Sequence, residues 1–129
     1  MNSRQLEKIR DLVTDDFVDH GSPVPLPPGP DGYIAILTFV TTVLQVRYEV
    51  HDVVSAGDTV AIRATAHGEN FVLPDGLEST GKSFAMKTAH FFRARDGKLC
   101  EHWGIRDELD VLYQVGALAP PVVALPRHT

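Results

Sequence analysis

Cysteine, basic charge and long apolar runs are all scarce in this chain of 129 residues. Its single cysteine, Cys100, excludes a disulfide within the chain and suits a reducing compartment. The net charge of -5 lacks the basic excess of a nucleic-acid-binding surface. No apolar run approaches the roughly 18 residues of a membrane helix, and the N-terminus lacks the apolar core of a signal peptide. We therefore expect a cytoplasmic protein that binds neither nucleic acid nor membrane.

The remaining composition is that of an ordinary globular domain. Hydrophobic residues make up 43% and charged residues 22% of the chain. This length predicts a single domain over residues 1–129. Residues 22–30 hold five prolines, which predicts an extended connection across the mouth of the fold. Residues 117–129 hold three more prolines and are expected to form an extended C-terminal arm.

Hydrophobic periodicity separates helices from strands along the chain. Apolar residues recur at helical spacing over residues 3–14, 31–44 and 107–115. From residue 46 the period changes to two, which predicts strands over 46–55 and 59–68 and two more within 82–107. Helices segregated from antiparallel strands indicate an α+β fold. A curved antiparallel sheet closed by helices on one side would enclose a cone-shaped cavity.

The segment 82–107 is the most informative part of the chain. Asp96-Gly97 lies between two apolar runs, which is a strong signal for a two-residue hairpin turn. Such a turn pairs Arg95 with Lys98. Counting outward then places His90 opposite Trp103.

Alternation along these two strands predicts a pocket wall. His102 falls on the opposite face, where a structural role or a subunit contact is predicted. The wall combines apolar and aromatic side chains with a histidine and, at its far end, an aspartate: Met86, Thr88, His90, Phe92, Glu101, Trp103, Ile105 and Asp107.

Several segments, in the same order, resemble the SnoaL-like polyketide cyclases of the nuclear-transport-factor-2-like superfamily. The resemblance covers residues 4–116. Its motifs are DFVDH at 16–20, GDTVA at 57–61, TGK at 80–82, DGKL at 96–99, EHW at 101–103, Asp107, and QVG at 114–116.

The resemblance implies a cone-shaped α+β fold and an intramolecular aldol condensation of a polyketide ester without metal or cofactor. It implies that Asp107 is the catalytic acid/base and that His90 lies in the same pocket. A homodimer or higher homo-oligomer is also expected. The expected ligand is a small apolar or polycyclic molecule. The predicted substrate-binding residues are Phe17, His20, Tyr33, Met86 and Trp103.

The sequence departs from the family pattern in two places. Relatives usually begin with a long helix that has no counterpart before residue 3, so a partner subunit is expected to cover one side of the cone. Asn70 stands where the family often has a histidine, which puts a substrate contact there in doubt.

Each candidate residue also has a purely structural interpretation. Asp107 could cap the helix that follows it, because aspartate is a preferred N-cap. His90, Phe17 and Trp103 could be core residues, and Tyr33 a partly exposed helix residue. A zinc site is not predicted, since no usual ligand spacing occurs.

Two classes of function therefore stay open. The first is a cofactor-independent cyclase, or a related isomerase, epoxide hydrolase or hydroxylase acting on a polycyclic natural product. The second is a non-catalytic module for ligand binding or dimerisation. The environment of the Asp107 carboxyl group is expected to distinguish them.

Overall fold

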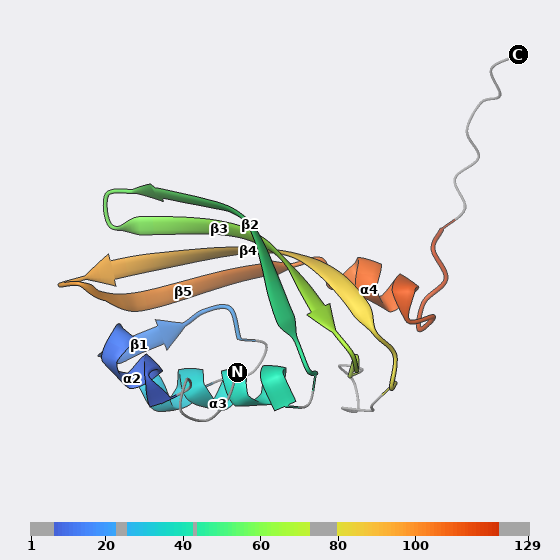
Figure 1. Cartoon of the computed structure of the whole chain (residues 1–129), viewed down its shortest axis with the longest axis horizontal. Coiled ribbons are helices and arrows are strands. Elements are labelled where there is room, and N and C mark those ends of the chain that lie inside the picture. The colour runs from blue at the N-terminus through green and yellow to red at the C-terminus, as the bar shows by residue number, and fades with distance from the viewer. Residues whose placement is uncertain (1–6, 23–25, 43, 73–79, 122–129) are drawn as a thin grey trace, which may run out of the picture.

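The structure, a computed structural model, describes residues 7–22, 26–42, 44–72 and 80–121. Its centre is a five-stranded sheet with strand order β1-β5-β4-β3-β2 (Figure 1). The strands are β1 (Val13–Asp19), β2 (Arg47–Ala56), β3 (Thr59–Gly68), β4 (Phe84–Arg95) and β5 (Lys98–Arg106). The described helices are α2 (Ile9–Leu12), α3 (Pro30–Thr42) and α4 (Glu108–Gln114). The predicted α+β class is confirmed.

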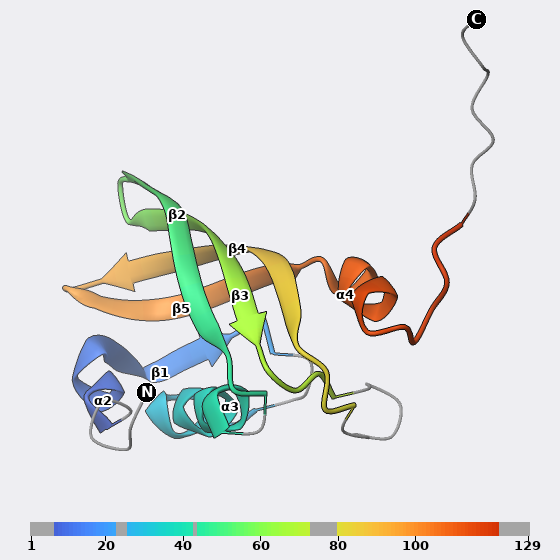
Figure 2. The ribbon, with the colours of Figure 1, turned by 45° about the vertical axis from the view of Figure 1, so that its right-hand side comes forward.

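The helices lie around a twisted, curved sheet. Helix α3 lies across one face of the sheet, α2 lies beside β1, and α4 follows β5 at the other end (Figures 1 and 2). One buried cluster joins α2, β1 and α3 through Ile9, Val13 and Phe17. A second cluster, which includes Phe84 and Val111, packs α4 against β4. Between the two clusters, the concave side of the sheet faces α3.

Strand β1 was not predicted from the sequence. Residues 13–19 pair in parallel with β5, whereas the other neighbouring strands pair antiparallel. The prediction of a helix to residue 14 and of four antiparallel strands was therefore wrong at this end of the chain. The aspartates of this segment have low strand propensity, and its pairing partner lies some eighty residues away, so the local pattern carried no signal.

The turn of the β4–β5 hairpin is confirmed. Asp96 and Gly97 have φ angles of 53° and 80°, the left-handed values that a type I′ turn requires at both central residues. Arg95 pairs with Lys98 as expected.

Beyond the turn, the predicted register of β4 and β5 differs from the observed one by one residue. A β-bulge shifts the pairing between Arg93 and Ala94, because Cys100 is an extra residue on β5. His90 consequently lies opposite Gly104, and Phe92 lies opposite His102. A shift of one residue exchanges the two faces of a strand. His102 therefore joins His90 on the concave face, and Trp103 moves to the convex one.

Residues 117–121 contain no helix or strand, and Gly116, with a φ of 76°, follows α4 as predicted. Residues 1–6 and 122–129 lie outside the described residues, as do parts of the two predicted loops. The boundaries of the domain and of the C-terminal arm stay predictions.

Candidate active site

A cavity of about 560 Å³ lies between α3 and the concave face of the sheet. Its wall on the helix side is the apolar stripe predicted from the sequence, which includes Tyr33, Leu37 and Val40. Small and apolar side chains of the sheet, together with Val46 just before β2, form most of the opposite wall: Val46, Val50, Ile62, Ala64, Ala66, Phe84, Met86 and Phe92. This size and lining suit a largely apolar small molecule.

Polar groups gather at one part of this cavity. Asp19 comes from the end of β1, His90 from the middle of β4, and His102 and Arg106 from β5. The parallel pairing of β1 and β5 sets Asp19 directly beside His102. The bulge at Cys100 turns His102 toward His90. Two features of the sheet thus bring these side chains together.

Asp19, His102 and His90 form a continuous hydrogen-bonded chain. His102 Nδ1 lies 2.7 Å from Asp19 Oδ1, and His102 Nε2 lies 2.9 Å from His90 Nδ1. The planes of the two imidazole rings are inclined to one another by only 16°, and the nitrogens that face each other are 2.9 Å apart, so a ring N–H can point at the neighbouring lone pair. The side chains of His102 and Asp19 are only 9% and 6% exposed. This arrangement fixes the orientation of both rings and can move a proton along them.

The charges in this chain follow from the neighbouring groups. Burial alone would raise the pKa of Asp19, but the hydrogen bond and charge of His102, the Gly21 amide and Arg106 together lower it. Burial, and then the charges of His102 and Arg106, lower the pKa of His90 to about 4. His90 is therefore neutral at physiological pH. The same lowered pKa makes its ring alone a weak base, so accepting a proton there depends on passing a proton on to His102.

Arg106 supplies a fixed positive charge beside the histidines. Its Nη1 donates to the Gly21 carbonyl at 2.7 Å, and its Nε donates to Glu108 at 3.1 Å. These two contacts hold the guanidinium group at the rim of the cavity. Such a group can stabilise an oxyanion that forms during a reaction.

Three of the predicted site residues line the cavity. His90 lies at its polar part, Met86 in the wall formed by β4, and Tyr33 on α3. Burial raises the pKa of Tyr33, and the charge of Asp19 adds to this effect, so the phenol remains protonated. The structure therefore brings these three side chains together around one space, and their catalytic and binding roles stay predictions.

The three other predicted substrate-binding residues lie outside this lining. Phe17 is 1% exposed and belongs to the core. His20 stacks on Trp103 at 5.0 Å and contacts Glu101. Trp103 faces the convex side because of the bulge, and Arg93 lies over its ring. Their assignment as substrate-binding residues gains no support from these positions.

Asp107 is also outside the cavity. It is exposed and forms the N-cap of α4, with its side chain accepting a hydrogen bond from the Asp110 amide at 3.2 Å. The expectation that it shares a face with His90 depended on the register and was wrong. Its catalytic role stays a prediction that these contacts do not favour.

The sequence analysis missed Asp19, His102 and Arg106 as site residues. His102 had been placed on the opposite face, and Asp19 belonged to a strand that was not predicted. The motif DFVDH at 16–20 was a signal for this region, but it drew attention to its histidine rather than to Asp19.

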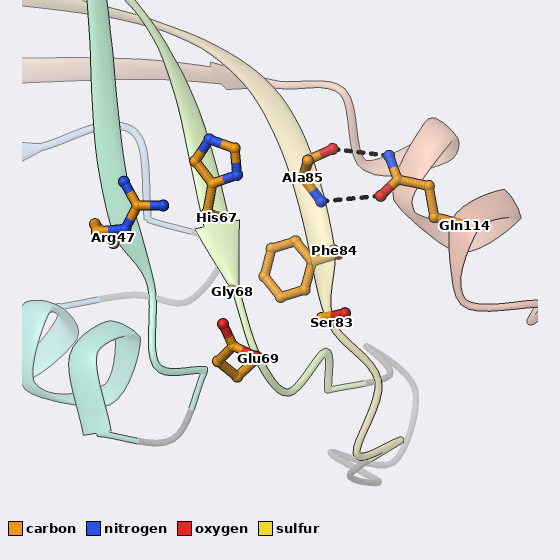
Figure 3. A pocket seen from close by; sticks show the side chains of 8 residues that line it. All are labelled: Arg47, His67, Gly68, Glu69, Ser83, Phe84, Ala85 and Gln114. Atoms are coloured by element: carbon orange, nitrogen blue, oxygen red, sulfur yellow. Dashed lines mark hydrogen bonds between the residues drawn. The ribbon is translucent and has the colours of Figure 1, made fainter.

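A second pocket, of about 360 Å³, lies near the ends of β3 and β4 (Figure 3). Its residues include Arg47, His67 and Gln114. Gln114 bonds both the amide and the carbonyl of Ala85, at 2.9 and 2.7 Å, and so holds α4 against β4. His67 Nε2 is hydrogen-bonded to Glu49 Oε1 at 2.9 Å. The contacts beside this pocket show how α4 is held against β4.

The described part of the chain has no group of three or more His, Cys, Asp or Glu side chains placed to hold a metal ion. Within those same residues, no helix is long and apolar enough to cross a membrane. The predicted oligomer and compartment stay predictions.

Acidification is expected to destabilise the fold through His90. A histidine with a pKa of 6.5 when unfolded and about 4 when folded binds its proton more readily in the unfolded chain. The free energy of unfolding therefore falls as the pH drops through this window, and the stability is regained above it. This change in the pKa of His90 corresponds to about 3 kcal/mol in the free energy of unfolding. Because the ring is partly exposed, we expect about 2 kcal/mol.

Urea unfolding at about pH 7 and about pH 4 measures this effect. The His90→Gln variant lacks this titration and should lose about 2 kcal/mol less than the wild type on acidification. An identical pH dependence of the two proteins would contradict the assignment.

Comparisons with known proteins identify the family. The family model of the SnoaL-like polyketide cyclases matches residues 1–115. IdmH, a candidate polyketide cyclase from Streptomyces antibioticus, is 33% identical over 89% of both chains, with a TM-score of 0.70. No curated protein matches the sequence. The chain belongs to the SnoaL-like polyketide cyclases.

More distant structures share the fold. A SnoaL-like polyketide cyclase from Agrobacterium tumefaciens C58 has a TM-score of 0.70 at 18% identity, over 89% of this chain and 88% of that one. AclR, a candidate hydroxylase from Streptomyces galilaeus, has the same TM-score at 20% identity, over 91% of this chain and 74% of that one. The predicted cone-shaped fold is thereby confirmed. The family supports a cyclase or a related enzyme, and the fold alone does not determine the reaction.

Proposed function

We propose that this protein is a cofactor-independent cyclase that closes a ring in a polyketide-like ester by intramolecular aldol condensation. The observation that carries the proposal is the chain from Asp19 through His102 to His90, which ends in an apolar cavity. In this proposal His90, rather than Asp107, is the general acid/base.

The substrate would be held mainly by apolar contacts. A cavity of about 560 Å³ can enclose much of a drug-sized molecule. The helix and sheet walls would cover its carbon skeleton, and the carbonyl groups would lie at the polar part. Excluding water there strengthens the interaction of Arg106 with a developing negative charge.

The first step would take a proton from the carbon beside a carbonyl group. In the free protein the Thr88 hydroxyl lies 3.1 Å from His90 Nε2, so the substrate would take the place of that hydroxyl at this nitrogen. The lone pair on His90 Nε2 would then accept the proton, and the electrons of the C–H bond form an enolate. The proton on His90 Nδ1 then moves to His102 Nε2, so that the positive charge lies next to Asp19. Arg106 would stabilise the enolate oxygen.

The second step would form the ring. The enolate carbon attacks a second carbonyl carbon of the same molecule, and the electrons of that C=O bond move to its oxygen. This alkoxide takes the proton from His90 Nε2, and His102 returns its proton to His90 Nδ1. No net proton or electron is gained, in agreement with a reaction that needs no cofactor.

Incubation of the protein with β-dicarbonyl esters in deuterated water tests this proposal. We expect a cyclised product, or deuterium incorporation at the carbon between the carbonyls, and the same rate with Asp107→Asn to within a few-fold. Asn keeps the N-cap of α4, so this variant should fold normally.

The alternatives predict other outcomes. Loss of turnover in Asp107→Asn would restore the catalytic assignment of that residue. Tight binding with neither product nor deuterium exchange would indicate a ligand-binding module instead.

A further inference from the structure

The hydrogen-bonded chain continues beyond His90. His90 Nε2 lies 3.1 Å from the hydroxyl of Thr88, and that hydroxyl lies 3.0 Å from the carbonyl oxygen of Ala64. Thr88 is 5% exposed, so its hydroxyl group has little access to water. The complete chain thus runs from a carboxylate to a backbone carbonyl, and both ends can only accept hydrogen bonds.

This chain has more hydrogen-bond links than it has hydrogens to fill them. The four links are Asp19–His102, His102–His90, His90–Thr88 and Thr88–Ala64, and each needs one hydrogen. Two neutral imidazoles and one hydroxyl supply only three. All four links are made only when the chain holds one additional proton.

The chain therefore has two self-consistent states. The state that holds the additional proton is called loaded. In it, His102 donates from both nitrogens, His90 donates from Nε2 to Thr88, and Thr88 donates to Ala64. In the unloaded state, His90 donates from Nδ1 to His102, and Thr88 turns its hydroxyl hydrogen toward His90 Nε2. Loading reverses the tautomer of His90 and the direction of the hydroxyl.

We propose that Thr88 is a positioning residue whose hydroxyl rotation switches His90 Nε2 between a proton-accepting and a proton-donating form. This inference deepens the proposed function, and its catalytic consequence rests on it. During turnover the substrate would displace the Thr88 hydroxyl from His90 Nε2, and that hydroxyl would donate to the Ala64 carbonyl instead. Removing a proton from the substrate then converts His90 from the unloaded tautomer into the loaded one. Delivering the proton to the alkoxide restores the unloaded state, so one nitrogen serves both steps.

The surrounding charges favour a proton on His102 rather than on His90. Asp19 contacts His102 directly, and its lowered pKa keeps it ionised. The rings of Tyr33 and Tyr48 lie 6.0 Å from His102 and 5.7 Å from His90. The titratable and charged side chains that line this cavity come from all the surrounding elements: Asp19, Tyr33, Tyr48, His90, His102, Arg106 and Glu108.

Nitrogen-15 NMR of the histidine side chains of the free protein, recorded across a pH titration, tests the inference. We expect His90 to be the Nε2–H tautomer at low pH and the Nδ1–H tautomer at high pH. The change should occur as one step of the coupled chain of hydrogen bonds rather than as the titration of a single residue. A His90 ring that keeps one tautomer throughout would overturn the inference.

The Thr88→Val variant isolates the hydroxyl. The loaded state loses two hydrogen bonds and the unloaded state only one, so the midpoint of the step should move to lower pH by about half a unit to one unit. Thr88→Ser should restore the wild-type midpoint. The control is Thr65→Val, which removes a hydroxyl bonded to His51 on the neighbouring strand and should leave the step unchanged.

These experiments distinguish a failure of the Thr88 switch from a failure of the proposed cyclase function. A midpoint in Thr88→Val equal to that of the wild type would overturn the role of Thr88, even if the protein is an active cyclase. A tautomer switch without turnover would keep the switch and reject the cyclase. Should Thr88→Val fail to fold, the wild-type titration alone still decides whether the switch exists.

Discussion

Replacing His90 with glutamine is expected to lower the turnover of the proposed reaction by about 10²- to 10⁴-fold. Glutamine retains polar atoms near the ring positions but cannot accept a proton from carbon near neutral pH. The link from the cavity to His102 and Asp19 is lost at the same time. Because the ring is replaced by a polar side chain of similar reach, substrate binding should change much less than the rate. Steady-state and single-turnover kinetics separate these two effects.

The matched control for this variant is His51→Gln. His51 lies on β2, is exposed, and bonds Thr65 rather than a cavity residue. It should retain wild-type turnover. Circular dichroism and urea unfolding near pH 7 should show that both variants are folded. A His90→Gln enzyme with turnover within about three-fold of the wild type would reject His90 as the base.

Replacing Phe17 with alanine is expected to lower the free energy of unfolding by about 3–5 kcal/mol. The ring is 1% exposed and packs with Ile9 and Val13 between α2, β1 and α3. Its centroid lies 4.7 Å from that of Tyr33, which lines the cavity. The substitution leaves a space in the core and removes the support of Tyr33. For a domain with an ordinary stability of about 5–15 kcal/mol, this is a large fraction.

Urea unfolding measures this loss, and Val18→Ala is its control. Val18 is the next residue on β1 and is 40% exposed, so its truncation should cost about 0.5 kcal/mol or less. If Phe17→Ala were as stable as the wild type but bound ligand weakly, Phe17 would be a substrate contact, as the sequence analysis predicted. A combined loss of stability and binding would indicate that the core positions Tyr33.

Much of the fold could be predicted because its signals are local. The change of period near residue 46, the stripe on α3 and the Asp96-Gly97 turn depend on neighbouring residues alone. These signals were sufficient for an α+β domain with an apolar cavity, and the resemblance identified the family. Three of the residues that they indicated, His90, Met86 and Tyr33, line that cavity, and their roles stay predictions.

The polar part of the site could not be predicted in the same way. Asp19 reaches His102 only because β1 pairs with a strand distant in the sequence. His102 turns toward His90 only because Cys100 is an extra residue in β5. Hydrophobic alternation looks the same with and without a bulge, so the sequence pattern could not indicate this one. The bulge places Asp107 and Trp103 away from the cavity.

The sequence by itself determined the elements from α3 onward, the apolar cavity and the family, because periodicity, turn residues and motifs act over short stretches of chain. The tertiary structure decided which polar side chains meet in that cavity. The physical reason is that the faces of paired strands exchange with every one-residue shift in register. That register is set by contacts between distant strands, so the chain from Asp19 to Ala64 exists only in the folded sheet.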